Sequence, residues 1–270
     1  MFLTPRWFAS HIFVALLIIA FIAAGFWQIN RLGQRQATNE RVTQRLDTVV
    51  TLDDAVAATG NIADELDFRR VQVTGQFDNN RELLIANRSR EGVAGFWMWT
   101  VFVEDDGSEL VVNRGFIDRA SILQLPNDSI AARISGERGD LTLQGLLRLG
   151  DLDARLSEDS TQLTRPDAEQ AKALLGVDST LPSEIYLQLE AQDPARSSEV
   201  PIALPLPDLT DGPHRSYAFQ WFTFATIGIA GYGLTLRRIA RGDEARGDVP
   251  IDEPLEPLTV ERRSPRPAGS

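Results

Sequence analysis

Two long apolar segments without a charged residue lie near the two ends of this chain, at residues 7–30 and 216–236. A helix needs about 20 apolar residues to cross the hydrocarbon core of a bilayer. No other segment of the sequence is as long and as apolar. The sequence therefore predicts a membrane protein with a two-helix transmembrane hairpin, its helices at 7–30 and 214–236, and a folded domain inserted between them.

The first apolar segment has one alternative interpretation, a cleaved export signal. Arg6 precedes it, as a basic residue does in such signals, but their apolar cores span only about 7 to 15 residues. Here the segment continues to Phe26 and Trp27 without an obvious cleavage site between small residues. We therefore expect the helix to be retained.

The arginines beside the two segments bear on orientation, because cytoplasmic ends of membrane helices are enriched in Lys and Arg. The second segment favours cytoplasmic termini, with Arg237, Arg238, Arg241 and Arg246 after it against Arg215 before it. The first segment favours the opposite, with Arg31, Arg35, Arg41 and Arg45 after it. Long loops cross largely regardless of charge. We therefore expect residues 1–6 and 237–270 in the cytoplasm and the inserted domain outside it.

The composition of the inserted part excludes several classes of function. Residues 31–215 contain 19 basic and 31 acidic side chains, a net charge of −12. Nucleic acid binds basic surfaces, so it is not an expected partner. The chain has no cysteine, which excludes disulfides, thiol catalysis and metal sites with cysteine ligands.

Apolar residues alternate with polar ones from about Phe68 onward, which is typical of strands. This pattern predicts an α+β extramembrane domain at 68–199 on a mainly antiparallel sheet. Strands are expected near 71–73, 83–85, 96–103, 110–117, 141–149 and 185–189, with turns at 78–80 and 105–108. A helix should begin near Pro166 and end at Gly176. Residues 31–67 should form a polar linker without a core, 200–213 a Pro-rich strap, and the tail from Gly242 should be disordered.

His214 is the first candidate ligand. It begins the second apolar segment, where the positive end of a helix dipole keeps an imidazole neutral, the form that binds iron. Helical spacing places Tyr217, Trp221 and Gly228 on its stripe. Tyr and Trp also concentrate at membrane interfaces, so an interfacial anchor is the alternative. The other histidine, His11, should lie across the bilayer and cannot share a metal with His214.

Trp27, Gln28 and Arg31 form a second candidate surface at the end of the first segment. Trp27 and Arg31 share one helix face, and Gln28 and Arg31 share a stripe with Arg35. Guanidinium groups there could bind an acidic ligand, for example a propionate. Membrane lipid phosphates are the simpler partner. The two apolar helices are expected to face each other along Ala20 and Ala24 on one side and Gly228 and Gly231 on the other.

These segments resemble the surfeit locus protein 1 family, the membrane-bound assembly factors of cytochrome c oxidase. A Gly-x-Trp-Gln-x-x-Arg-Leu motif matches Gly25, Trp27, Gln28, Arg31 and Leu32, and a Pro-x-His-x-x-Tyr-x-x-x-Trp-Phe motif matches His214, Tyr217, Trp221 and Phe222, with Pro213 one residue closer than usual. An early strand motif matches Arg69, Val71, Val73, Gly75 and Phe77, and an Asn-Arg-Gly motif matches Asn113, Arg114 and Gly115. The family often has Thr-Pro where this chain has Thr100 and Val101.

The resemblance implies a role in building the haem and copper subunit of the oxidase, at the stage where haem a is delivered or held, in the plasma membrane of a bacterium. Oxidase subunits and haem a synthase would be partners. His214 would be the haem iron ligand, and a groove lined by Trp27, Tyr217 and Trp221 would cover the porphyrin. The alternative is a scaffold that binds oxidase subunits without haem.

Two further interpretations concern the inserted domain. Arg114 in the Asn-Arg-Gly motif either binds an anionic partner or merely precedes a glycine that ends a strand. A hydrolase is not expected, because the domain has no cysteine and no histidine before His214 to activate a nucleophile. We therefore expect no enzymatic activity.

Overall fold

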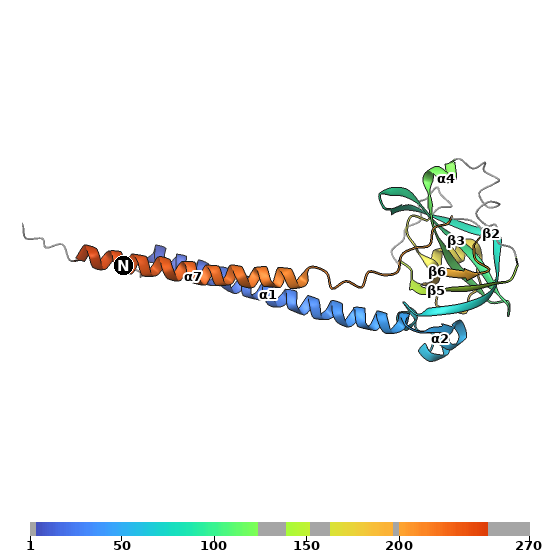
Figure 1. Ribbon diagram of the computed structural model, residues 1–270, viewed down its shortest axis with the longest axis horizontal. Coiled ribbons are helices and arrows are strands. Elements are labelled where there is room, and N and C mark those ends of the chain that lie inside the picture. Colours follow the sequence, from blue (N-terminus) through green and yellow to red (C-terminus); the bar gives the residue numbers. More distant parts are fainter. Residues whose placement is uncertain (1–3, 124–138, 152–162, 197–199, 248–270) are drawn as a thin grey trace, which may run out of the picture. The chain divides into compact units, whose positions relative to one another are not determined.

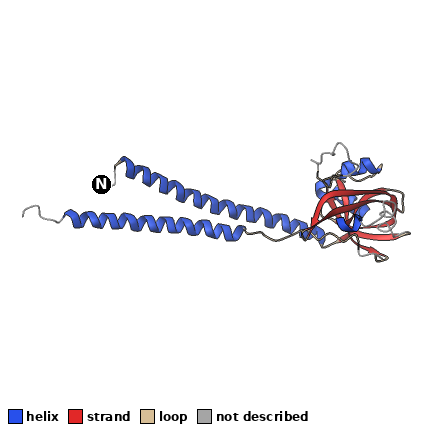
Figure 2. Ribbon diagram, turned by 90° about the horizontal axis from the view of Figure 1, so that it is seen from above, coloured by secondary structure: helices blue, strands red, loops and turns tan. Residues whose placement is uncertain are grey.

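A computed structural model describes residues 4–123, 139–151, 163–196 and 200–247 of the chain. The chain divides into two units. One contains Met1–Gly33 and Gly212–Ser270, and the other contains Gln34–Asp211. Figure 2 distinguishes the two long helices from the strands of the inserted domain.

The first helix, α1 (Pro5–Leu46), is longer than predicted. It continues through the polar residues after position 30, because good helix formers such as Gln and Arg dominate there and neither Pro nor a second Gly interrupts them after Gly33. It is long and apolar enough to cross a membrane, and among the described residues no other helix meets the same test. The prediction of a first span is therefore supported.

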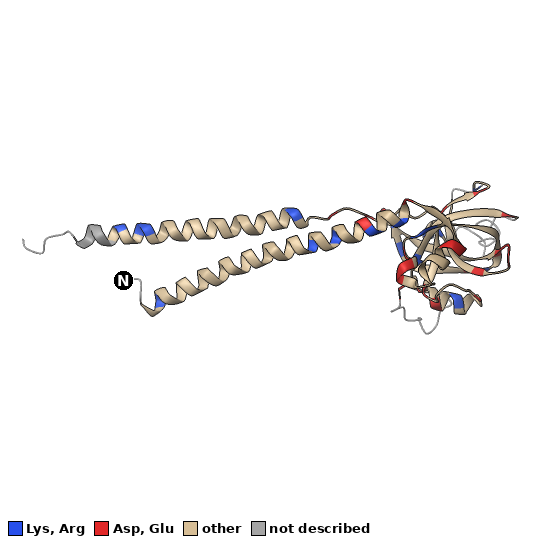
Figure 3. Ribbon diagram, turned by 90° about the horizontal axis from the view of Figure 1, so that it is seen from below, with Lys and Arg blue, Asp and Glu red and all other residues tan. Residues whose placement is uncertain are grey.

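The second long helix, α7 (His214–Gly247), begins where the sequence predicted. It continues beyond position 236, so the expectation of disorder from Gly242 is wrong for 242–247, while residues 248–270 lie outside the described part. The middle of each long helix carries no charged residue (Figure 3). Gln220 and several Gly and Thr residues make α7 less apolar than α1. The second membrane crossing therefore stays a prediction.

The inserted domain is a barrel of five strands, of which Figure 1 labels β2, β3, β5 and β6. Its strands are β2 (Arg70–Arg90), β3 (Val93–Glu104), β4 (Glu109–Asp118), β5 (Leu141–Leu149) and β6 (Ile185–Asp193). Hydrogen bonding follows the order β2-β3-β4-β6-β5, and β5 pairs again with β2, so the ring closes. Closure leaves these five strands with few free edges.

The sheet is mixed, which corrects the prediction of a mainly antiparallel sheet. β4 pairs with β6 in parallel, and a short strand, β1 (Val49–Thr51), pairs with β2 in parallel. A parallel pair requires a crossover between its strands. Here the chain between β4 and β6 supplies it, passing through β5 and the helix α6 (Ala168–Leu175). The other strand pairs are antiparallel, as expected.

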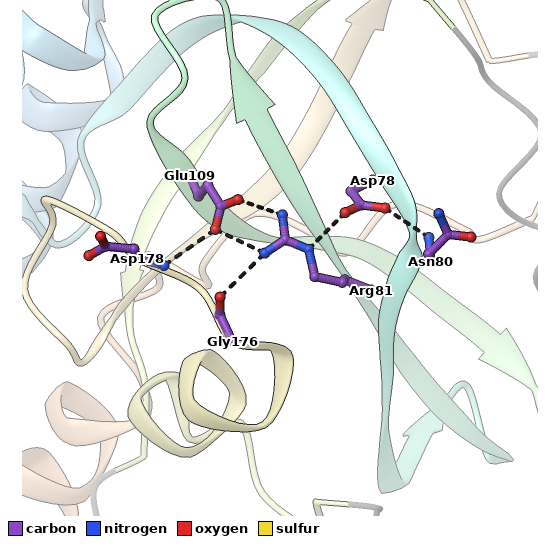
Figure 4. A network of polar contacts seen from close by, with 6 residues as sticks. All are labelled: Asp78, Asn80, Arg81, Glu109, Gly176 and Asp178. Atoms are coloured by element: carbon purple, nitrogen blue, oxygen red, sulfur yellow. Dashed lines mark hydrogen bonds and ion pairs between the residues drawn. The ribbon is translucent and has the colours of Figure 1, made fainter.

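β2 is one strand of 21 residues, where the sequence predicted two strands and a turn at 78–80. The residues Asp78, Asn79 and Asn80 instead produce a register shift against β3. Arg81 stabilises this bulge, since its guanidinium contacts the carboxylates of Asp78 at 2.7 Å and Glu109 on β4 (Figure 4). Both contacts lower the pKa of those carboxyls. The predicted turn is therefore wrong, because an ion pair holds the segment inside the strand.

Successive side chains of β4 enter two different cores, because strand side chains alternate between faces. Leu110 and Val112 belong to one cluster, with Phe77 and Phe102, and Val111 belongs to another, with Trp99. The second cluster packs against α6. That helix is confirmed, with Asp167 accepting a hydrogen bond from the Gln170 amide at its start and Gly176 in the left-handed region at its end.

Part of the predicted polar linker belongs to the core, which corrects the expectation that 31–67 has none. Two helices, α2 (Leu52–Thr59) and α3 (Ala63–Leu66), follow β1. Leu52, Ala55 and Leu66 are buried in the first core cluster. Leu52, Ala55 and Val56 are spaced at i, i+3 and i+4, which is a helical signal that the sequence argument did not use. Another short helix, α4 (Arg119–Leu123), follows β4.

The Pro-rich strap is extended, as predicted, and it is bonded along the inserted domain. Ile202 exchanges two backbone hydrogen bonds with Phe116 of β4, at 2.7 and 2.8 Å. Gln188 donates to the Pro205 carbonyl, and Asn39 donates to the Leu209 carbonyl at 2.7 Å. The strap thus satisfies part of β4 that β6 leaves uncovered, since β4 pairs with β6 at only two positions.

Candidate functional site

The two long helices contact each other through a seam in which an early residue of α1 meets a late residue of α7. His11 contacts Tyr232, and Gln28 contacts His214, so the helices run antiparallel. Less exposed positions recur at spacings of three and four residues, the pattern of a helix–helix seam. They are positions 11, 14, 18, 21, 25 and 28 of α1 and 214, 218, 221, 225, 228 and 232 of α7.

Small residues allow the helices to approach near the end of the seam that contains Gln28. A Cβ atom added to Gly25 would lie 2.7 Å from the Phe222 ring, closer than atoms tolerate. Ala218 and Ala225 of α7 are buried. Small side chains at a helix–helix contact are what close packing of membrane helices requires. Because Gly25 has no side chain, the Phe222 ring can pack against α1 one turn before Gln28.

The predicted facing residues are only partly those of the seam. Gly228 does contact α1, because a Cβ added there would lie 3.5 Å from Ile18. A Cβ at Gly231 would have no atom within 4 Å, and Ala20 is exposed. The seam positions recur about every 3.5 residues, and Gly25, Ala218 and Ala225 are the small residues that fit this spacing. The prediction considered only the size of the residues and not their spacing.

Gln28 and His214 are the predicted site residues that the structure joins directly. The Gln28 side chain is 9% exposed, and its Oε1 lies 2.9 Å from His214 Nδ1. His214 is partly buried and follows Gly212, which has a φ of +68°, and Pro213. The Tyr217 amide donates to the Pro213 carbonyl at 3.1 Å and closes the first helical turn. The two motif segments, far apart in sequence, thus meet through one polar contact.

The other predicted site residues are placed around this contact in different ways. Trp221 is in the seam, stacked on Phe21 with ring centroids 5.8 Å apart. Trp27 is 58% exposed, Tyr217 is 47% exposed and Arg31 is exposed. Two of the three aromatic residues expected to line a groove therefore lie on the outer surface of the helices. Their assignment to a binding site remains a prediction.

The second polar contact of the seam was not anticipated from the sequence. The Tyr232 hydroxyl contacts His11 Nδ1, and the two rings meet edge to face with centroids 5.8 Å apart. Tyr232 lies 18 residues after His214, five turns along the same helix, so a helical stripe extended beyond Gly228 would have included it. The two histidines thus have different partners, at opposite ends of the seam.

The Asn-Arg-Gly motif lies inside the domain, where the structure gives Arg114 and Gly115 contacts within the chain. Arg114 is 1% exposed, with its guanidinium 3.6 Å from the Glu82 carboxylate and over the Phe77 ring. Burial raises the pKa of Glu82 to about 7, although Arg114 opposes the change. A Cβ on Gly115 would lie 2.2 Å from the Ile202 carbonyl oxygen, so glycine lets the strap approach β4. The anionic partner of Arg114 thus belongs to the chain itself.

Three parts define the class of this protein. They are a pair of antiparallel apolar helices, a closed barrel, and an extended strap that connects the barrel to the second helix in the chain. The chain belongs to the SURF1 family, whose sequence profile matches residues 15–226. That range contains Gln28, Arg114 and His214, so the two motif segments and the barrel all lie within the match.

Individual relatives agree with this membership. A SURF1-like protein of Mycobacterium tuberculosis is 28% identical over 97% of this chain and 94% of its own length. A SURF1-like protein of Rickettsia bellii is 26% identical over 89% of this chain and 96% of its own. The yeast Saccharomyces cerevisiae has a protein named cytochrome oxidase assembly protein SHY1, which is 28% identical over 40% of this chain and 28% of its own length.

Proposed function

We propose that this protein is an assembly factor for cytochrome c oxidase and that it assists the delivery of haem a to the catalytic subunit, or the stabilisation of that subunit. Family membership and the name of the yeast relative, cytochrome oxidase assembly protein SHY1, support the oxidase role. The contact between Gln28 and His214 supports the haem role, because it places one imidazole at the junction of the two motif segments. Oxidase subunits and haem a synthase would be its partners.

The residues around this contact suit a haem that is handed on. Bound haem would supply an iron that takes an imidazole ligand and a flat apolar ring that favours aromatic neighbours. His214 would provide the imidazole, and the exposed Trp27 and Tyr217 would provide apolar contact. With 3.6 residues per turn in antiparallel helices, Tyr217 and Arg31 fall on the same flank of the seam. Arg31 could there bind a propionate.

We place both long helices in the plasma membrane of a bacterium, with the barrel outside the cytoplasm. Large apolar side chains point away from the seam, among them Phe13 and Phe219, which are 66% and 75% exposed. Such side chains are stable in lipid. Because the chain has no cysteine, single cysteines can report topology. Ser108→Cys should react with an impermeant maleimide in intact spheroplasts, whereas Thr4→Cys should react only after lysis.

A scaffold that binds oxidase subunits without haem is the second candidate. The exposure of Trp27 and Tyr217 favours it, because these aromatic residues are also available to a protein partner. An absorption spectrum of the detergent-purified protein from cells that make haem a separates the two functions. Haem a bands in the wild type that disappear in His214→Ala support haem holding. No bound haem in either, with oxidase assembly still dependent on the protein, supports the scaffold.

A further inference from the structure

We infer that Gln28 is a positioning residue for His214: its Oε1 holds the imidazole proton on Nδ1, so that neutral His214 presents an unprotonated Nε2 as the atom available to a metal. This inference deepens the proposed haem role and rests on it for the identity of the metal. The statement about the proton concerns this chain alone. It can therefore be tested without haem.

The direction of the hydrogen bond follows from the chemistry of the two groups. The atom of Gln28 nearest to the ring is Oε1, at 2.9 Å from Nδ1, and a carbonyl oxygen can only accept. Nδ1 must then donate. A neutral imidazole carries one N–H group, so its Nε2 holds the free electron pair that binds metals. The opposite orientation of the amide would place the proton on Nε2 and block that atom.

The position of Gln28 makes this contact hard to replace with water. Gln28 is 9% exposed, which limits the access of water, and buried polar groups almost always have a hydrogen-bond partner. Gly25 lies one turn earlier on the same helix face and leaves room for the Phe222 ring, which lets α7 come close enough for the contact. Gly25 and Gln28 thus act together, the first by its size and the second by its carbonyl oxygen.

The other edge of the imidazole faces a residue that has no side chain. A Cβ added to Gly212 would lie 3.7 Å from His214 Nε2 and 3.6 Å from Cδ2. Any larger residue at 212 would therefore occupy space next to Nε2, and the φ of +68° at this position also favours glycine. Gly212 keeps the metal-binding edge of His214 accessible, while Gln28 occupies the opposite edge.

The second histidine provides an internal contrast. His11 Nδ1 contacts the Tyr232 hydroxyl, which can either donate or accept. That partner does not determine where the imidazole proton lies. Of the two histidines in the chain, His214 is thus the one whose partner fixes the proton. Outer partners that fix the tautomer of a metal-binding histidine are usual in metal sites, and their loss typically costs about 10- to 100-fold in affinity.

The test uses the full-length protein, labelled with ¹⁵N-histidine, in detergent at a pH where imidazole is neutral. Two histidines give two sets of ring signals, which His11→Gln assigns. We expect wild-type His214 to carry its proton on Nδ1. Gln28→Met, of similar length but without an acceptor oxygen, should lose that preference, and Gln28→Glu, whose ionised carboxylate can only accept, should keep it. Tyr232→Phe should leave the His214 signals unchanged.

Ferric protoporphyrin IX serves as a metal probe in the same samples. We expect Gln28→Met to weaken its binding about 10- to 100-fold, Gln28→Glu to retain it, and His214→Ala to abolish the histidine-ligated spectrum. A wild-type His214 protonated on Nε2, or a tautomer unchanged in Gln28→Met, overturns the inference whatever the probe does. A tautomer that depends on Gln28 while wild type binds no porphyrin supports the positioning role and removes the haem part of the proposed function.

Discussion

In the barrel the largest apolar side chains are buried, whereas along the two long helices many of them are exposed. Trp99 and Phe102 are fully buried between strands, while Phe13 and Phe219 are 66% and 75% exposed. The seam between the helices carries amide, imidazole and phenol groups among its aromatic and small residues. Apolar burial can stabilise the barrel in water. The exposed apolar side chains of the helices would instead be stabilised by an apolar solvent such as lipid, as the proposed membrane location supplies, while the polar contacts lie between the helices.

The same difference distinguishes two polar contacts made by motif residues, Arg114 with Glu82 and Gln28 with His214. Arg114 and Glu82 form a polar contact closed within the domain, where the strap covers β4 at Gly115. Gln28 and His214 form a polar contact beside exposed Trp27 and Tyr217. The first arrangement is enclosed within the domain, whereas in the second the Nε2 edge of the imidazole faces Gly212, where an added Cβ would lie 3.7 Å away. Function is therefore better sought at the helix seam than in the barrel.

The largest difference between the two regions should appear on removing one aromatic residue from each. Trp99→Ala deletes a fully buried side chain that packs on Tyr186 with ring centroids 4.6 Å apart. It should lower the free energy of unfolding by about 3 to 5 kcal/mol. Phe219→Ala removes an exposed ring and should change it by less than about 0.5 kcal/mol. Denaturation of the full chain in detergent, followed by circular dichroism, measures both, and equal losses would contradict the comparison.

Glu82 should make barrel stability depend on pH. Its pKa is raised from 4.5 to about 7 because it is buried. The folded state then binds a proton more tightly than the unfolded state, so stability falls as pH rises between these values. The full effect is about 3 kcal/mol. Unfolding of wild type and Glu82→Gln at pH 5 and pH 8 should show wild type losing this stability relative to the variant, and a constant difference would refute the assignment.

The strap should leave the barrel when Gly115 gains a side chain. In Gly115→Ala the new Cβ would lie 2.2 Å from the Ile202 carbonyl oxygen, with a φ of +131°. We expect a loss of about 1 to 3 kcal/mol, typical of a strained backbone position, and faster proteolysis near Ile202. Gly107→Ala is the matched control, because φ there is +88° but no atom lies within 4 Å. Equal proteolysis of the two variants would show that the strap does not depend on Gly115.

Local patterns predicted the elements whose signals are short in range. The bounds of β5 agree with the alternation from Leu141 to Leu149, and α6 lies between the expected start near Pro166 and the expected end at Gly176. The bulge in β2 was missed because turn-forming residues at 78–80 are held in the strand by Arg81 and Glu109, 28 positions apart. The parallel pairing of β4 with β6 likewise depends on a distant partner.

The candidate site shows the same limit. His214, Gln28 and their neighbours were found from helical spacing and from motifs, residue by residue. Their pairing was not predicted, because 186 positions separate them and the register between two helices depends on which side chains are small. Gly25 is one of the small residues that set this register, but the sequence alone does not show that Phe222 lies against it. Tyr232 was missed because the stripe was not followed to the far end of α7.

The smallest effect is expected in the helix seam, where two glycines differ in their neighbours. Ile18→Cys with Gly228→Cys forms a unique cysteine pair in this chain, at a place where a Cβ on Gly228 would lie 3.5 Å from Ile18. Adding Gly25→Ala, whose Cβ would meet Phe222 at 2.7 Å, should slow disulfide formation about fivefold, the factor for 1 kcal/mol. Gly231→Ala has no atom within 4 Å of its new Cβ and should leave the rate unchanged. If both substitutions slowed it equally, helix propensity or lipid contact would explain the result, and Gly25 would have no special part in bringing Gln28 to His214.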